Sequence, residues 1–249
     1  MPVCFRYMTE QLRKENIELT PRLFLIAERV PCGARFADVG TDHGHLPLYL
    51  LREGRISSAI ASDIRPGPLE HAKENAAFHG LSNHVRFVLA GGLDGISARE
   101  CDTIAIAGMG GETIAEILSA APWTRKGEHL LLLQPMTSIY ELRQWLWSHG
   151  YGIEEEAVCR EGRRNYVVLS VRGTGGPDSA PRALFDCCVS AALLRAPGAR
   201  EYLEHLLARE QWAFDGMRAG QSIEPAVLEE QRRLVENLRR AWEEITCQS

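Results

Sequence analysis

One short stretch, residues 35–47 with the sequence RFADVGTDHGHLP, constrains the fold of this chain more than any other. Its apolar start ends in Asp38-Val39-Gly40 and breaks into a glycine-containing turn, which is typical of a strand that leads into a nucleotide-binding loop. In an open α/β sheet, ligands bind outside the carboxyl ends of the strands, where glycine lets the backbone approach closely. We therefore expect a cofactor at this turn, with contacts from Asp38, Gly40, Asp42, His43 and Gly44.

Strand and helix patterns alternate along the chain. A helix is expected from Glu10 to Val30, interrupted near Thr20-Pro21, where Thr suits a helix cap and Pro a first helical position. Strands are expected at 35–39, 58–63, 85–89, 102–106 and 129–134, and helices at 46–52, 67–79, 112–120 and 139–148. This order predicts a mostly parallel, doubly wound α/β sheet. Strands near 152–158 and 165–171, separated by a short charged segment, predict an antiparallel hairpin at one edge.

The segment 173–181, GTGGPDSAP, is the clearest boundary in the sequence, because it is rich in glycine and proline and has no apolar period. It predicts a main domain at 1–172, a linker at 173–181 and a helical, coiled-coil-like domain at 182–249. Two apolar stripes in that last part predict an antiparallel helical hairpin that turns at 220–225. We favour a packing arm over a direct substrate-binding role for it. The stripes comprise Leu203, Leu206, Glu210, Ala213 and Met217, then Val227, Gln231, Leu234, Leu238, Ala241 and Ile245.

Composition narrows the class of protein further. The chain has 249 residues, 45% of them hydrophobic, and no stretch approaches the roughly 20 apolar residues of a membrane helix. The first residues, MPVCFRYMTEQLRKEN, lack the pattern of a secretory signal, so we expect a cytoplasmic protein. The seven cysteines show no CxxC spacing, which favours buried reduced thiols over disulfides and predicts no metal site. A net charge of −5 disfavours a uniformly basic nucleic-acid binder and leaves room for a local basic patch.

The first loop differs from the loops that bind dinucleotides. In Gly40-Thr-Asp-His-Gly44 the position of a middle glycine is taken by Asp42, whose carboxylate would face a pyrophosphate, and the chain contains no P-loop. A cofactor with a cationic centre and no phosphate, such as S-adenosylmethionine, suits an acidic loop better than NAD does. Asp63, at the end of the second strand, stands where an acid accepts hydrogen bonds from ribose hydroxyls, although a helix cap is the alternative.

Three motifs occur in a characteristic order: DVGTDHGHLP at 38–47, IAGMGG at 106–111 and LLQPM at 132–136. Together they resemble the bacterial TrmK family of tRNA adenine-22 N1-methyltransferases, over roughly residues 15–172. The resemblance implies a class I methyltransferase (Rossmann-like) fold and S-adenosyl-L-methionine as the methyl donor. It also implies methylation of N1 of adenine 22 in the D-arm of tRNA, and a C-terminal coiled-coil-like domain.

The resemblance also implies roles for individual residues. The turn 40–44 would surround the methionine and ribose parts of the cofactor, Asp63 and Ile64 its ribose and adenine, and 107–111 would separate cofactor and target base. Two departures from the family pattern stand out. A turn that commonly carries Asp or Asn reads Ala90-Gly91-Gly92-Leu93 here, and Met136 replaces a common Asn, which leaves a polar role to Gln134 or to the backbone. The further cofactor candidates are Gly92, Leu93, Ala107 and Gly108.

Methyl transfer to adenine N1 asks for positioning more than for acid or base chemistry, because N1 already has an in-plane lone pair. Correct placement accounts for as much as about 7 to 11 kcal/mol in the best intramolecular reactions. The glycines of AGMGG let the backbone approach a flat base, and Met109 is suited to lie against its face. Met109 and Gln134 are therefore our candidate catalytic residues. The alternative for Met109 is a core position in a strand-to-helix turn.

The hairpin carries the best candidates for contact with RNA. Residues 156–172 hold four Arg and two Glu, and an aromatic residue stands among them. Phosphates bind arginine, and extruded bases stack on aromatic rings, as expected for an enzyme that acts on a base. Our candidates for substrate binding are Arg160, Arg163, Arg164 and Tyr166, and the alternative is an ordinary solvated hairpin. A second possible patch comprises Arg13, Lys14 and Arg22 on the first helix.

The sequence leaves three functions open. The first is a tRNA methyltransferase that acts on adenine N1. The second is a small-molecule methyltransferase, which the net negative charge favours. The third is a non-catalytic nucleotide-binding module whose helical arm docks a protein partner, which the altered turn at 90–93 favours. The expected oligomeric state is a monomer or a weak dimer.

Overall fold

The computed structural model describes residues 17–178, 180, 182–220 and 223–247. The predicted helix from Glu10 to Val30 lies partly outside these residues, as do Arg13 and Lys14. Within them, helix α2 (Pro21–Ala27) begins at the proline, as predicted. Thr20 occupies the cap position, but its side chain makes no capping hydrogen bond.

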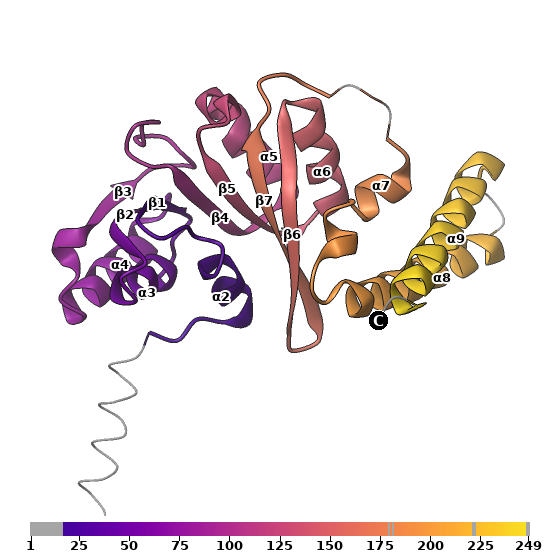
Figure 1. Ribbon diagram of the computed structural model, residues 1–249, viewed down its shortest axis with the longest axis horizontal. Coiled ribbons are helices and arrows are strands. Elements are labelled where there is room, and N and C mark those ends of the chain that lie inside the picture. The colour runs from indigo at the N-terminus through magenta and orange to yellow at the C-terminus, as the bar shows by residue number, and fades with distance from the viewer. Residues whose placement is uncertain (1–16, 179, 181, 221–222, 248–249) are drawn as a thin grey trace, which may run out of the picture.

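Seven strands form one sheet at the centre of the molecule (Figure 1). They are β1 (Ala34–Val39), β2 (Ile56–Asp63), β3 (Val85–Leu89), β4 (Thr103–Gly110), β5 (Leu130–Thr137), β6 (Tyr151–Glu161) and β7 (Arg164–Gly173). Their order is β3-β2-β1-β4-β5-β7-β6, parallel through β5 and antiparallel at β7 and β6. This confirms the predicted doubly wound sheet with a hairpin at one edge. The order reverses between β1 and β4, which opens a crevice at their carboxyl ends.

Strands β4 and β5 run past their predicted ends at 106 and 134. Met109 pairs with Pro135 and Gly110 pairs with Thr137, with register shifts between these pairs. Pairing with a neighbouring strand overrides the low strand propensity of glycine, so most of AGMGG is strand. Gly111 begins the next helix, and a Cβ there would lie 2.3 Å from the carbonyl oxygen of Ser138, so only glycine fits.

Helices cover both faces of the sheet. One face carries α2, α3 (His45–Arg52) and α4 (Pro66–Phe78), and the other carries α5 (Gly111–Ala120) and α6 (Ile139–Ser148). Successive strand residues point to opposite faces. Accordingly, Leu132 belongs to the core under α3, whereas Leu131 and Leu133 belong to the core under α5 and α6.

The C-terminal region is helical, as predicted, with α7 (Leu184–Cys188), α8 (Ala199–Ala219) and α9 (Pro225–Cys247). Helices α8 and α9 pack side by side as a hairpin (Figure 1). The two polar residues of the predicted stripes are partners, because Gln231 Nε2 donates to Glu210 Oε2 over 2.9 Å. Val227, predicted in the stripe, is instead 44% exposed.

The predicted linker begins as part of the sheet. Gly173 ends β7, Thr174 N donates to Gly150 O, and Asp178 N donates to Trp147 O. Leu203 and Leu238 of the helical region also belong to the same hydrophobic cluster as Leu169 of β7. The division of the chain at residue 172 stays a prediction.

A buried ion pair joins α6, β6 and α7. Arg143 donates to both carboxylate oxygens of Glu156, over 2.9 and 2.6 Å, and both side chains are fully buried. Its remaining nitrogen donates to the carbonyl oxygens of Cys187 and Cys188. Replacing one partner of such a pair leaves an unpaired charge in the core and lowers the free energy of unfolding by about 3 to 5 kcal/mol.

The described cysteines are all free thiols, as expected. Burial raises the pKa of Cys101 and of Cys188 to about 12. Cys32 and Cys247 are exposed, so the expectation that the thiols are buried is wrong for these two. Of the helices in the described part of the chain, none has the length and apolar character needed to cross a membrane.

Candidate cofactor and substrate site

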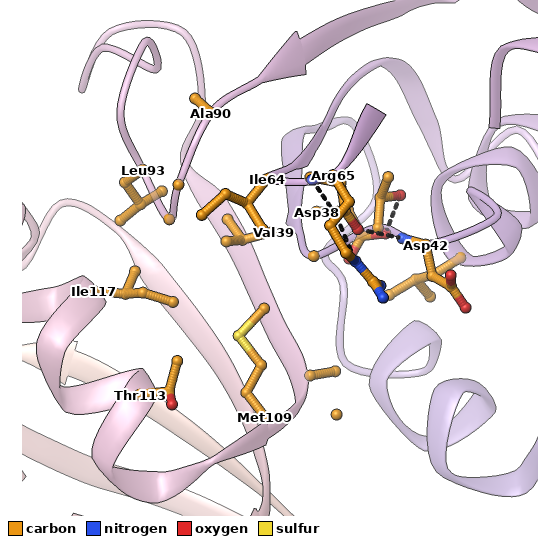
Figure 2. Close-up of a pocket in the computed structure, with 18 of the residues that line it drawn as sticks. Asp38, Val39, Asp42, Ile64, Arg65, Ala90, Leu93, Met109, Thr113 and Ile117 are labelled. Carbon is orange, nitrogen blue, oxygen red and sulfur yellow. Dashed lines mark hydrogen bonds and ion pairs between the residues drawn. The ribbon is translucent and has the colours of Figure 1, made fainter. Parts of the chain in front are cut away.

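A cavity of about 650 Å³ opens at the carboxyl ends of β1, β2 and β4. Figure 2 shows Met109 pointing into it, with Thr113 and Ile117 of α5 on one side and Asp38 and Asp42 on the other. The cavity therefore lies at the crevice predicted from the strand order. The predicted cofactor residues that line it are Asp38, Gly40, Asp42, Asp63, Ile64, Gly92, Leu93, Ala107 and Gly108.

The loop after β1 forms one wall of the cavity. The backbone N–H groups of Gly40 and Thr41 both donate to Ser62 O, over 2.8 and 2.9 Å, which ties the loop to β2. Gly40 and Asp42 have positive φ angles of 72° and 53°. A Cβ on Gly40 would lie 2.2 Å from Met109 Cε, so a glycine here leaves room for the methionine.

Asp38 is a buried carboxyl group at the base of this loop, 5% exposed. Burial raises the pKa of Asp38 to about 6, and the nearby charge of Asp63 adds to the rise. The hydroxyl of Thr41 donates to Asp38 Oδ2 over 2.7 Å. This hydrogen bond stabilises the ionised carboxylate and so lowers the pKa, against the effect of burial. Asp38 is therefore mostly ionised at neutral pH and gains a proton in mild acid.

Asp63 connects two loops at the rim of the cavity. Its Oδ2 accepts from Asp42 N over 3.3 Å and its Oδ1 accepts from Arg65 N over 2.9 Å. The Arg65 guanidinium also approaches, with Nε 3.6 Å from Oδ1. Each carboxylate oxygen accepts more than one hydrogen bond, so these contacts leave capacity for a ligand hydroxyl.

The opposite end of the cavity is apolar. Ile64 is 72% exposed there, which is unusual for a large aliphatic side chain next to a cavity. The turn after β3 brings its backbone against it: a Cβ on Gly91 would contact Ile64 Cδ1 at 3.6 Å, and Gly92 packs on Ile117. Without the Asp or Asn common in the family, this turn presents backbone and Asp94 to the cavity.

Gln134 lies behind the cavity and does not line it. The side chain is fully buried, and its Oε1 accepts from Gly108 N over 3.2 Å and from Arg22 Nη1 over 3.4 Å. Its Nε2 donates to Pro135 O and to Met136 Sδ. Its polar atoms thus hold the backbone at Gly108, where φ is +75°, and aim Arg22.

Arg22 lines the cavity, although the sequence predicts it in a separate basic patch. Its Nε lies 3.9 Å from Glu161 Oε2, at the tip of the hairpin, which fixes the guanidinium between α2 and the hairpin. Four residues of α5 were also missed as lining residues. They are Thr113, Glu116, Ile117 and Ala120. Their spacing puts them on one face of the helix that directly follows AGMGG, and this spacing was the signal in the sequence that could have identified them.

His43 and Gly44 do not line the cavity in this structure. The ring of His43 instead lies 5.3 Å from that of His71 and 5.8 Å from that of His45. A Cβ on Gly44 would lie 3.1 Å from Ala72 Cβ, so this glycine lets α3 start against α4. Their assignment to the cofactor stays a prediction. Burial lowers the pKa of His45, which does line the cavity.

A second cavity, of about 740 Å³, lies between the hairpin, α6 and α8. Arg163, Arg164 and Tyr166 line it, whereas Arg160 does not and its Nε donates to Gly162 O over 3.2 Å. The structure thus gathers three of the four predicted substrate residues. Within the described residues, no group of three or more His, Cys, Asp and Glu side chains is arranged to hold a metal ion.

Comparisons with known proteins agree with this geometry. Residues 19–169 match the family described as a methyltransferase domain. The chain is 37% identical over 182 residues to the tRNA (adenine(22)-N(1))-methyltransferase of Bacillus subtilis, which covers 73% of this chain and 75% of that protein.

Solved structures show the same fold. The B. subtilis M1A22 tRNA methyltransferase TrmK has a TM-score of 0.72 and 29% identity, covering 93% of this chain and 98% of that one. Streptococcus pneumoniae Sp1610, in complex with S-adenosyl-L-methionine, has a TM-score of 0.75 and 29% identity, covering 89% of this chain and 99% of that one. The predicted resemblance and the class I methyltransferase fold are confirmed. The chain belongs to the TrmK family of bacterial tRNA (adenine(22)-N(1))-methyltransferases.

Proposed function

We propose that this protein transfers the methyl group of S-adenosyl-L-methionine to N1 of adenine 22 in tRNA. One observation carries the proposal beyond family membership: the ends of β1 and β2 and the loop after β1 bring Asp38, Asp63 and Asp42 around a nucleoside-sized cavity. Clustered carboxylates repel a diphosphate and attract a cation. The cavity therefore suits a sulfonium cofactor and disfavours NAD.

The residues present fit that cofactor along its whole length. Asp63 would accept hydrogen bonds from the ribose hydroxyls, and Ile64 would cover the adenine, with Gly92 and Ile117 on the side toward α5. Arg22 is placed to bind the carboxylate of the methionine part. Asp38 and Asp42 would face its positive charge. We retain the prediction that His43 and Gly44 contact the cofactor.

S-adenosylmethionine, when bound, supplies a methyl group on a positively charged sulfur that needs no activation by the protein. The protein's task is to hold adenine N1 in line with the methyl–sulfur bond. Met109 projects into the cavity beside Gly40. Its flexible thioether would pack against the target base, which is the role we propose for it as a catalytic residue. Gln134 would act as a positioning residue, because it fixes the N–H of Gly108. Carboxylates nearby would stabilise the positive charge that N1 methylation leaves on adenine.

The test is incubation with unmodified bacterial tRNA and radiolabelled S-adenosylmethionine, followed by nucleoside analysis. We expect 1-methyladenosine in wild-type tRNA and none in a transcript with guanine at position 22. Label in small metabolites without label in tRNA would support the small-molecule alternative. Cofactor binding without any turnover would support the non-catalytic module.

The cellular location, the oligomeric state and the metal dependence of the protein are proposed as follows. We propose a cytoplasmic location, because tRNA serves translation there. A monomer or weak dimer and chemistry without a metal stay predictions, which sedimentation analysis and activity in the presence of a chelator would check.

A further inference from the structure

The second cavity forms a groove that we call the arginine groove. It is defined by residues from three elements that are far apart in sequence, of which only those of the hairpin were predicted to bind substrate. The defining residues are Arg163, Arg164 and Tyr166 of the hairpin, Tyr140 of α6, and His205 and Arg209 of α8. The groove therefore exists only because α8 packs beside the hairpin (Figure 1).

The arginine groove adjoins the cofactor cavity. Met109 lines the cavity, and its partner across the β4–β5 ladder, Pro135, lines the groove. Gln134 links the two, because it holds Gly108 on one side and donates to Met136 Sδ over 3.6 Å on the other. A base seated at Met109 would thus leave its neighbouring nucleotides at the entrance to the groove.

The charge of the arginine groove is opposite to that of the cofactor cavity. Its lining includes three arginines and one acid, Glu141. Arg163 and Arg164 are exposed, and their guanidinium groups form no ion pair or hydrogen bond with any residue that the structure describes. In a chain of net charge −5, two unpaired guanidinium groups at a groove next to the active site favour an anionic ligand.

Aromatic rings stand among these arginines. Tyr140 lies under the Arg209 guanidinium, whose Cζ is 5.3 Å from the ring centroid, and Arg209 also donates to Glu210 over 2.6 and 2.9 Å. Tyr166 is half-buried on β7 next to the free arginines. Arginine that binds phosphate beside exposed aromatic rings is the pattern that binds unpaired nucleotides.

We propose that the arginine groove binds the RNA strand next to the target adenine. This inference rests on the proposed tRNA methylation. Arg163 and Arg164 bind the phosphates that flank the extruded adenine, and an adjacent unpaired base stacks on Tyr166. Arg209, held over Tyr140 by Glu210, closes the groove from the helical arm. The arm then contributes directly to substrate binding, contrary to our expectation of a packing role.

The test compares an R163A/R164A variant with an R99A/R218A control, which removes equal charge from exposed positions outside the groove. We expect the groove variant to bind unmodified tRNA about tenfold more weakly. Its plot of log Kd against log salt concentration should be shallower by about 0.7 for each lost phosphate contact. Binding of S-adenosylhomocysteine should be unchanged in both variants.

Two variants of Tyr166 test whether an RNA base stacks on its ring. Y166L should weaken tRNA binding without changing its salt dependence, and Y166F, which keeps the aromatic ring, should lose less affinity than Y166L. If the wild type methylates tRNA and the groove variants bind it as the control does, the arginine groove is not an RNA site. If the wild type does not methylate tRNA at all, the proposed function itself fails.

Discussion

The terminal methyl group of Met109 lies against Gly40: a Cβ built on Gly40 would be 2.2 Å from Met109 Cε. The loop after β1 and the end of β4 are therefore fitted to each other across the cofactor cavity. A residue larger than glycine at position 40 must displace the end of the Met109 side chain, which lines the cavity.

Gly40→Ala should weaken binding of S-adenosylhomocysteine by about tenfold or more, measured by calorimetry, because it displaces Met109. A non-glycine residue at this φ of +72° also costs about 1 kcal/mol of stability. Gly33→Ala is a matched control, because its φ is +79° and its Cβ would meet nothing within 4 Å. That control should lose similar stability and keep full binding. Adding Met109→Ala to Gly40→Ala should restore binding, and failure to do so would contradict the steric explanation.

Asp38 should make stability depend on pH in mild acid. Burial raises its pKa from 3.8 to about 6, so the folded protein binds this proton more tightly than the unfolded chain does. The resulting stabilisation is complete below about pH 3.8 and is lost as the pH rises through about 6. Two pKa units correspond to about 3 kcal/mol. Urea unfolding across this range should show the loss in the wild type and a flatter profile for Asp38→Asn.

Thr41→Val supplies the control for Asp38. Removing the hydroxyl that donates to Asp38 Oδ2 should raise the pKa of Asp38 further, so the loss of stability should extend to higher pH. A wild-type profile shared by both variants would show that another group titrates.

Arg22 should recognise the amino-acid end of the cofactor. Arg22→Met should weaken binding of S-adenosylhomocysteine by about ten- to a hundredfold, because a charge-assisted hydrogen bond is lost. Its affinity for 5′-methylthioadenosine, which lacks that carboxylate, should stay at the wild-type level. Arg65→Met, at the Asp63 end of the cavity, should affect both ligands alike. Equal losses for both ligands in Arg22→Met would place its role elsewhere.

The hydrogen bond between Glu210 and Gln231 should stabilise the packing of α8 against α9. Gln231→Leu removes a 2.9 Å hydrogen bond from a carboxylate that is 9% exposed, which should cost about 1 to 3 kcal/mol of unfolding free energy. The double variant Glu210→Leu/Gln231→Leu should regain part of that stability, because the buried carboxylate and amide are removed together, and Arg209, which also donates to Glu210, is 59% exposed and can bind water instead. Thermal unfolding measures both, and additive losses in the double variant would argue against direct coupling.

Much of the fold follows from local sequence pattern. The strand at 85–89 and the helix at 139–148 have the predicted bounds, because apolar period and turn residues act over a few neighbours. The extension of β4 through Gly110 was not foreseen, because it depends on pairing with β5. The partner of buried Arg143, Glu156, likewise belongs to another element.

The sequence by itself determined the doubly wound α/β class, the acidic residues Asp42 and Asp63 at the ends of the first two strands, and the family, since each follows from short motifs along the chain. Only the tertiary structure decided that Arg22 lines the cavity, that Gln134 is buried behind it, and that Arg209 joins the hairpin at a second groove. The physical reason is that these contacts join segments separated by many residues. Their geometry is set by how helices pack on the sheet, which no local pattern encodes.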